Sequence, residues 1–418
     1  MTEPAASWLD ELPARLQALD TAHLLRRRRV VRPLGDGYLS VDGERLLAFC
    51  SNDYLGLAGD PALVTAACEG ARHYGVGSGA SPMVSGHSVA NAALEEELAR
   101  FVGLPRALYF YAGFATNASV IPALVGEGDA LFSDALNHAC LIDGARLSKA
   151  TIHRYAHADL DQLGQQLAAC TARRKLVLSD AVFSMDGDVA DVPRLLQLCE
   201  QHDALLLIDD AHGFGVLGPQ GRGTLAQCGL VGPKASRRVL YMATLGKALG
   251  VAGAFVAGDA TLVEWLLQKT RSYTFATAAP ALLAEALRAS LRCVERDDWR
   301  RARLAELVSV LRQRLHAGLA GTGWRLLDSP TPIQPLIVGD NATALALMDG
   351  LRQHGLWVPA IRPPTVPAGT ARLRIALSAA HSVADVERLA DTILALSPRM
   401  SRIPQNFQIP QVSQEPTA

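Results

Sequence analysis

One lysine, Lys247, stands between two apolar segments that both have the character of interior strands, Val239–Ala243 and Ala254–Ala257. Lysine is almost never fully buried without a partner, and in an apolar setting it tends to lose its charge. A neutral lysine amine is a nucleophile that can form a Schiff base with a carbonyl compound. A charged lysine in a glycine-rich surface turn is the alternative, and this stretch alone leaves both interpretations open.

Two carboxylates and a histidine, Asp209, Asp210 and His212, follow the very apolar segment Leu205–Asp209. The carboxyl end of a strand is the usual ligand edge of an open α/β sheet. Strand alternation should point Asp209 and Asp210 to opposite faces. A metal site would need a third ligand that the sequence does not make evident. The alternative is one carboxylate that holds a cation, such as the protonated ring nitrogen of pyridoxal phosphate.

The segment Tyr111–Asn117 follows the predicted strand Ala107–Phe110 and opens a helix that continues through Ile121. Free backbone N–H groups and the helix dipole at such a helix start favour an anion, for example a phosphate. A plain strand-to-helix turn is the alternative. His138 follows the predicted strand Ala130–Ser133 at the same sheet edge, where it is either a hydrogen-bonded loop residue or a partner that stacks on a ring.

Three glycine-rich stretches were tested as nucleotide sites. Gly213–Gly218 matches GxGxxG and follows a strand, but Pro219 and two further glycines come next, so no helix opens there. Gly75–Ala80 follows a helix rather than a strand, and Gly246-Lys247 lacks the other residues of a P-loop. We expect none of the three to bind a nucleotide.

The chain has 418 residues, 49% hydrophobic and 19% charged, with a formal net charge of -1. This near-neutral balance lacks the excess of positive charge that predicts binding to nucleic acid or to an acidic membrane surface. The 7 cysteines form no CxxC pair and are predicted to be small core residues in a reducing compartment. The sequence shows no signal peptide and no bilayer-spanning apolar run, so we expect a cytoplasmic protein.

The order of predicted elements indicates an α/β fold. A helical pattern over residues 1–30 ends in four arginines, and after residue 100 apolar strands alternate with helices. Continuously apolar strands are typical of a mostly parallel sheet that is covered on both faces. The predicted strands are Ala107–Phe110, Ala130–Ser133, Thr151–Tyr155, Leu176–Ser179, Leu205–Asp209, Val239–Ala243 and Ala254–Ala257.

Beyond residue 280 the pattern changes to long helices and short strands, which predicts a smaller α+β domain. Ser382 and Asp385 form a capping box that should start the last helix. The predicted divisions are an N-terminal helical arm with short strands (1–50), a large α/β domain (51–285), a small C-terminal domain (286–400) and a disordered tail (401–418).

Together these residues carry a resemblance to the α-oxoamine synthases, a family of pyridoxal-phosphate enzymes with the aspartate-aminotransferase fold, fold type I. The resemblance covers about residues 5–398. It is carried by Gly113-Phe114, His138, Ser184, Asp209–His212, Thr244–Lys247, and the segments 51–57, 333–341 and 360–374.

The resemblance implies a role for each of these residues. Lys247 would bind the cofactor as a Schiff base and remove the Cα proton of the amino acid, a step that needs a neutral amine. Asp209 would keep the pyridine nitrogen protonated, and His138 would stack on the ring. The phosphate or the phenolic oxygen would be contacted by Gly113, Phe114, Ser184, His212 and Thr244.

The substrate side follows from the same resemblance. Arg374, with Asn52, would grip the amino-acid carboxylate. Arg26 and Thr365 would lie on the acyl-thioester side, with Ser78 near the substrate. Thr277 would reach the phosphate in the neighbouring subunit of a homodimer, although Phe275 and Ala276 lack the hydroxyls common there in relatives.

The segments 51–57, 333–341 and 360–374 match the subgroup that condenses L-alanine with a pimeloyl thioester of coenzyme A or acyl carrier protein. A sister enzyme that uses glycine and another acyl thioester is the alternative. A nicotinamide-dependent dehydrogenase and a catalytically silent cofactor-binding regulator are two further hypotheses from other classes.

Overall fold

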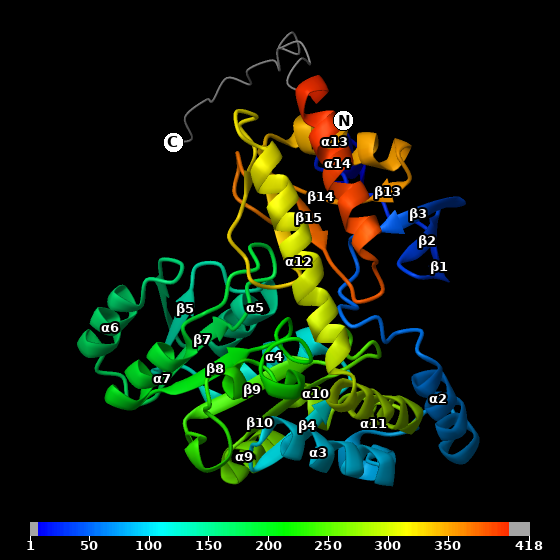
Figure 1. Cartoon of the computed structure of the whole chain (residues 1–418). Helices are drawn as coiled ribbons and strands as arrows, with labels where there is room; N and C mark the ends of the chain where they lie inside the picture. The colour runs from blue at the N-terminus through cyan, green and yellow to red at the C-terminus, as the bar shows by residue number, and fades with distance from the viewer. Residues whose placement is uncertain (1–6, 401–418) are drawn as a thin grey trace, which may run out of the picture.

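The computed structural model describes residues 7–400 of the chain (Figure 1). The largest sheet in this part has seven strands in the order β4-β10-β9-β8-β7-β5-β6. These strands are β4 (Arg106–Phe110), β5 (Ala130–Asp134), β6 (Thr151–Tyr155), β7 (Lys175–Asp180), β8 (Leu205–Asp209), β9 (Val239–Thr244) and β10 (Ala254–Gly258).

The seven predicted strands are confirmed, with bounds that differ by at most one residue at either end. Strands β5 to β9 pair in parallel, and β10 runs antiparallel to both β9 and β4. The sheet is therefore mostly parallel, as the continuous apolar runs predicted.

Helices cover both faces of this sheet. Leu207 of β8 belongs to the core cluster formed with α4 (Gly113–Leu124), α5 (Ala139–Ser148) and α9 (Ala260–Lys269). Its neighbours Leu206 and Ile208 belong to a second cluster. That cluster includes residues of α3 (Val89–Val102), α6 (Leu160–Ala169), α7 (Val192–Gln201) and α11 (Ala281–Arg296). Because successive side chains of a strand alternate between faces, one apolar run supplies both layers.

Two four-stranded sheets lie apart from the large one. One has the order β11-β12-β15-β14, and the other, β1-β2-β3-β13, pairs β3 in parallel with β13. Their strands are β1 (Val31–Gly35), β2 (Tyr38–Val41), β3 (Glu44–Ala48), β11 (Arg325–Leu326), β12 (Ile333–Gly339), β13 (Leu356–Trp357), β14 (Ala360–Ile361) and β15 (Ala371–Ala376).

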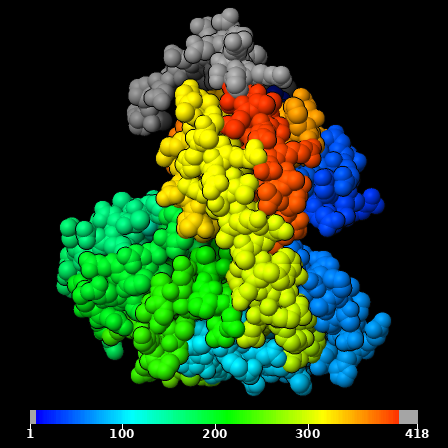
Figure 2. All heavy atoms as spheres, viewed as in Figure 1, coloured from blue at the N-terminus to red at the C-terminus, as the bar shows by residue number. Residues whose placement is uncertain are grey.

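The long helix α12 (Asp298–Gly318) runs from the central-sheet part to these smaller sheets, and Figure 2 shows it on the surface of both parts. It packs against α14 (Val383–Met400), which also packs against α13 (Asn341–Gln353). The Ser382–Asp385 capping box is confirmed, since each residue's backbone N–H donates to the other's side chain at 2.8 and 3.2 Å.

The predicted N-terminal helix is shorter than expected. Helix α1 (Trp8–Thr21) ends before the four arginines, because His23 has a left-handed backbone with φ 55° and the amides of Leu24 and Leu25 both donate to the Leu19 carbonyl. The arginines beyond it lie in an extended segment, where Arg27 pairs with Asp20 and Arg29 with Asp42.

The cysteine prediction is partly wrong. All seven are free, but only Cys140, Cys199 and Cys293 are buried, while Cys68 and Cys228 are exposed. Cys68 lies on α2 (Pro61–Tyr74), whose buried residues Leu63 and Gly70 face the other way. The four domain divisions stay a prediction, and the predicted tail lies outside the described residues.

Among the described residues, no helix has the length and apolar character that a membrane crossing requires.

Candidate active site

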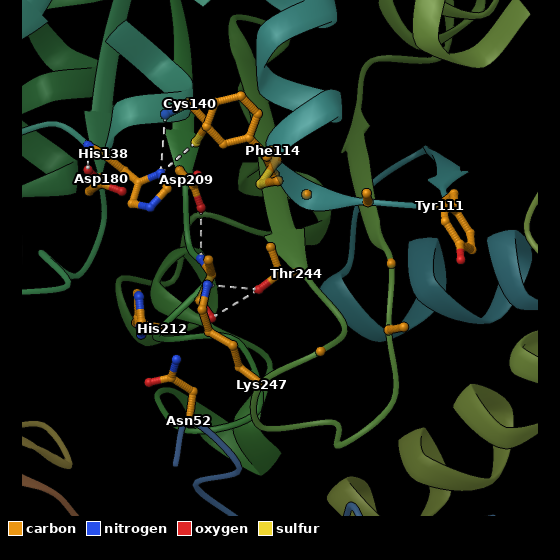
Figure 3. Close-up of a pocket in the computed structure, with 17 residues that line it drawn as sticks. Asn52, Tyr111, Phe114, His138, Cys140, Asp180, Asp209, His212, Thr244 and Lys247 are labelled. Carbon is orange, nitrogen blue, oxygen red and sulfur yellow. Dashed lines mark hydrogen bonds between the residues drawn. The ribbon is translucent and has the colours of Figure 1, made fainter. Parts of the chain in front are cut away.

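A cavity of about 500 Å³ opens at the carboxyl ends of the central strands (Figure 3). Its walls come from the ends of β7, β8 and β9, the starts of α4 and α5, the turn between β9 and β10, and Asn52 after β3. Of the predicted site residues, the cavity is lined by Asn52, Gly113, Phe114, His138, Asp209, His212, Thr244 and Lys247.

Lys247 lies in the turn that joins β9 to β10. Its Nζ donates to Thr244 Oγ1 at 3.1 Å, and Figure 3 shows the two side chains facing each other. Burial lowers the pKa of Lys247, and the carboxylates of Asp209 and Asp180 only partly oppose that effect. The amine can therefore be neutral more readily than an exposed lysine, which is what a nucleophile or general base requires.

Asp209 and Asp210 point to opposite faces, as the strand alternation predicted. Asp209 faces the cavity, where it accepts hydrogen bonds from Asn117 Nδ2 at 2.6 Å and from the Ala211 amide at 3.0 Å. Asp210 points the other way and accepts from the Thr224 amide and the Tyr241 hydroxyl, both at 2.7 Å. Burial raises the pKa of Asp210 to about 7.

His138 caps the start of α5. Its backbone N–H donates to Asp180 Oδ2 at 2.6 Å, and its Nδ1 lies 2.9 Å from Cys140 Sγ. Burial lowers the pKa of His138, so the neutral ring is favoured. Burial and the nearby charge of Asp209 raise the pKa of Asp180 well above its usual range.

The first turn of α4 begins without a side-chain cap. Its N-cap residue, Ala112, has no side-chain oxygen to accept the free backbone N–H groups, and Gly113 and Phe114 lie at the cavity wall. A Cβ on Gly113 would stand 2.5 Å from Thr244 Cγ2, so a side chain here would force Thr244 or the helix start to move. Such an uncapped helix start favours a phosphate group.

A buried polar network lies on the other side of Lys247. The Tyr54 hydroxyl lies 2.7 Å from His212 Nδ1 and donates to Asn52 Oδ1 at 3.2 Å. Arg374 donates from Nη1 to Asn52 Oδ1 at 3.2 Å and from Nη2 to the Tyr54 hydroxyl at 3.4 Å. Burial and the nearby Lys247 lower the pKa of His212 well below its usual range.

The remaining predicted residues do not line the cavity. Ser184 meets Arg374 through its backbone, because its carbonyl accepts from Arg374 Nε at 2.6 Å. Arg26 Nη2 donates to Thr365 Oγ1 at 3.1 Å on the surface, so these two residues do lie together. Ser78 donates to the Ala278 carbonyl, and Thr277 is exposed.

Four residues at the site were not singled out from the sequence: Tyr54, Asn117, Cys140 and Asp180. Each lies in or next to a segment that the sequence analysis did single out. For example, Asn117 follows the start of α4 and Cys140 follows His138. Asn117, Cys140 and Asp180 lie at or after the carboxyl end of a central strand, which was the available signal. Tyr54 follows β3 of another sheet, so no such signal marked it.

No group of three or more His, Cys, Asp or Glu side chains that could hold a metal ion occurs in residues 7–400. At the GxGxxG match, Asp210 packs closely against the backbone, because a Cβ on Gly213 would stand 2.1 Å from Asp210 Oδ1. The helix that follows, α8 (Thr224–Gln227), has only four residues.

Comparison with known proteins agrees with this geometry. A sequence model of the family described as aminotransferase class I and II matches residues 44–393. The 8-amino-7-oxononanoate synthase 1 of Polaromonas sp. (strain JS666) is 71% identical over 94% of this chain and 96% of that protein.

Two solved structures are also similar. A serine palmitoyltransferase from S. paucimobilis with a bound PLP–myriocin aldimine has a TM-score of 0.86 and 27% identity, covering 95% of this chain and all of that one. The 8-amino-7-oxononanoate synthase of Francisella tularensis has a TM-score of 0.73 and 28% identity, covering 85% and 99%. The chain therefore belongs to the aminotransferase class I and II family and, within it, to the 8-amino-7-oxononanoate synthases.

Proposed function

We propose that this protein is a pyridoxal-phosphate-dependent acyltransferase of biotin biosynthesis. It condenses L-alanine with a pimeloyl thioester, of coenzyme A or acyl carrier protein, and yields 8-amino-7-oxononanoate, carbon dioxide and the free thiol carrier. The observation that carries the proposal is the partly buried amine of Lys247, which shares one cavity with the Asp209 carboxylate and the uncapped start of α4. The names of the similar proteins support the same reaction.

The residues present fit pyridoxal phosphate. The phosphate would lie at the amides of Gly113 and Phe114, with the Thr244 hydroxyl beside them, and the ring between His138 and the opposite wall. When bound, the cofactor supplies an electron sink for the charge left on the amino-acid Cα. Asp209 would hold a proton on the ring nitrogen, since its carboxylate faces the cavity and is fixed by two donors.

Lys247 would hold the cofactor's aldehyde carbon and, as a neutral amine, take the Cα proton of alanine. Arg374 and Asn52 would bind the alanine carboxylate, because a guanidinium grips a carboxylate with two hydrogen bonds. His212 would contact the phenolic oxygen, with Ser184 nearby.

We place the acyl thioester beside Arg26 and Thr365, with Ser78 near the substrate, and Thr277 at the phosphate of a second subunit in a homodimer. Three of these residues, Arg26, Thr365 and Thr277, are exposed in the single chain, and Arg26 donates a hydrogen bond to Thr365. An exposed Thr277 is compatible with a role across a subunit interface. A cytoplasmic location is part of the same proposal.

Gly113→Ala should weaken binding of pyridoxal phosphate. The added Cβ would collide with Thr244 Cγ2 and displace either the helix start or the Thr244 side chain. Overpacking of this kind costs about 1–3 kcal/mol, so the dissociation constant should rise roughly tenfold to a hundredfold. Equilibrium dialysis of the apoprotein measures it. Gly126→Ala is the matched control, because its Cβ would meet nothing closer than 3.8 Å; equal affinity in both variants would contradict the assignment of the phosphate site.

The reaction itself is tested by incubating the holoenzyme with L-alanine and pimeloyl-CoA, or pimeloyl-acyl carrier protein, and measuring the amino ketone by mass. Formation of 8-amino-7-oxononanoate is the expected result. Turnover of glycine in place of alanine would favour a sister enzyme. Binding of a nicotinamide cofactor, with no lysine that borohydride can trap, would favour a dehydrogenase.

A further inference from the structure

The turn Phe183–Asp188 follows β7 of the central sheet. It contacts the smaller sheet through Arg374 and Arg372 of β15. It is closed on itself by two backbone bonds, from the Phe183 amide to the Asp188 carbonyl at 3.0 Å and from the Gly187 amide to the Phe183 carbonyl at 2.8 Å. Val182 and Val189 form a bridge at its base. These contacts tie the two ends of the turn together.

The smaller sheet holds one side of this turn. Arg374 Nε donates to the Ser184 carbonyl at 2.6 Å, and Arg372 Nη1 donates to Asp186 Oδ1 at 2.5 Å. The Gly187 carbonyl accepts from Ser329 Oγ at 2.8 Å and from Thr331 Oγ1 at 3.1 Å. Since Arg374 uses Nε here and its two terminal nitrogens toward Asn52 and Tyr54, the turn helps to set the plane of its guanidinium.

His157 holds the other side. Its Nδ1 lies 3.0 Å from Asp134 Oδ1, its Nε2 lies 2.9 Å from Asp188 Oδ2, and its ring packs edge-on against Phe183 at 4.4 Å between centroids. Both carboxylates are acceptors, so both ring nitrogens must donate, and only the imidazolium can do so. Asp134 is itself fixed, because it also accepts from the backbone amides of Leu136 and Ala158.

We propose that His157, bound as an imidazolium between Asp134 and Asp188, is a positioning residue for Arg374: it fixes the turn Phe183–Asp188, whose Ser184 carbonyl orients the guanidinium. The inference rests on the proposed function, in which Arg374 binds the carboxylate of alanine. His157 touches neither substrate nor cavity; it acts through the turn.

The charge on His157 should also appear in the stability of the fold. The two carboxylates raise the pKa of His157 from 6.5 to about 10. A raised folded-state pKa adds stability that is fully present below the unfolded value and is lost as pH rises through the folded one. The difference in free energy of unfolding between wild type and His157→Gln should therefore shrink as pH rises from about 6.5 to about 10. Urea unfolding at several pH values measures it, and a pH-independent difference would overturn the charged state.

The positioning role is tested with His157→Gln and Asp188→Ala. A glutamine can donate to one carboxylate but turns its oxygen toward the other, and alanine removes only the contact to the turn. In both holoenzymes the dissociation constant of L-alanine, read from cofactor absorbance without thioester, and the KM for L-alanine should rise about tenfold, the effect of losing one bond to a charged group. The KM for pimeloyl thioester and the pyridoxal-phosphate content should stay within about twofold.

His153→Gln is the matched control, because His153 lies on β6, just before the segment that carries His157, is also half-buried, and stacks on Phe132 away from the turn. Its alanine constants should match those of wild type. A fall in kcat or in cofactor content without a change in the alanine constants would show a merely structural role and overturn the assignment. An effect in His157→Gln but none in Asp188→Ala would overturn the route through the turn. If wild type itself shows no alanine response, the proposed function is wrong and this assignment falls with it.

Discussion

Replacement of Lys247 by alanine is expected to lower turnover at least about a thousandfold, the largest effect of any single change at the site. The variant loses both the amine that would hold the cofactor and the base that would take the Cα proton, and positioned proton transfer alone is worth about 10²–10⁴-fold. Steady-state turnover with saturating pyridoxal phosphate measures the loss. Borohydride treatment followed by peptide mass analysis should label Lys247 in the wild type and leave this peptide unlabelled in the variant.

Lys269→Ala is the control for this change. Lys269 lies at the end of α9, with its Nζ 5.2 Å from the centre of the exposed Trp265 ring and outside the cavity. It should keep turnover within about twofold of wild type. Turnover that survives in Lys247→Ala, or borohydride labelling of another lysine, would contradict the proposed function.

Asp209→Asn should lower turnover about a hundredfold while the fold remains intact. The amide keeps the shape of the side chain but removes the negative charge that would hold the proton on the ring nitrogen, and a bond to a charged group is worth about 1.5–3 kcal/mol. One donor, Asn117 Nδ2, at 2.6 Å, would also face an amide rather than a carboxylate. Turnover and cofactor absorbance of the holoenzyme, measured with thermal unfolding, separate the chemistry from stability.

The adjacent residue supplies the comparison for Asp209. Asp210 is equally buried but faces Thr224 and Tyr241 rather than the cavity, and its pKa of about 7 means that it is partly neutral already. Asp210→Asn should therefore keep turnover within about threefold, with any cost seen in stability. Equal losses of turnover in the two variants would mean that charge anywhere at the end of β8 matters, and would contradict a specific role for Asp209.

The strands of the central sheet could be predicted well, because the residue pattern that marks a strand lies within the strand itself. Several central strands are continuous apolar runs, and alternation along Leu205–Asp209 was enough to separate Asp209 from Asp210. Lys247 could be recognised because the two strands around it are interior ones. The N-terminal helix was predicted to be too long, because nothing in the periodicity of this segment indicates that His23 takes a left-handed conformation.

What could not be predicted depends on contacts between distant parts of the chain. In the sequence Asn117 looks like an ordinary polar residue of α4. Its role depends on Asp209 of β8, which lies 92 residues further along the chain and accepts its hydrogen bond. The hydrogen bond from Arg374 to the Ser184 carbonyl uses a backbone acceptor, so no pattern of side chains in the sequence can predict it. Tyr54 was part of a recognised segment, yet its partners His212 and Arg374 come from two other segments.

The parallel pairing of β3 with β13 has a consequence for how the protein is made. Leu47 and Ala48 pair with Leu356 and Trp357, and Glu44 binds Arg352 with two hydrogen bonds at 2.8 and 2.9 Å. A ribosome adds about 5–20 residues per second, so strands β1 to β3 emerge many seconds before their edge partner exists. During that interval the exposed edge of β3 is open to pairing with other chains, and a nascent polypeptide should need shielding there until translation has passed residue 357.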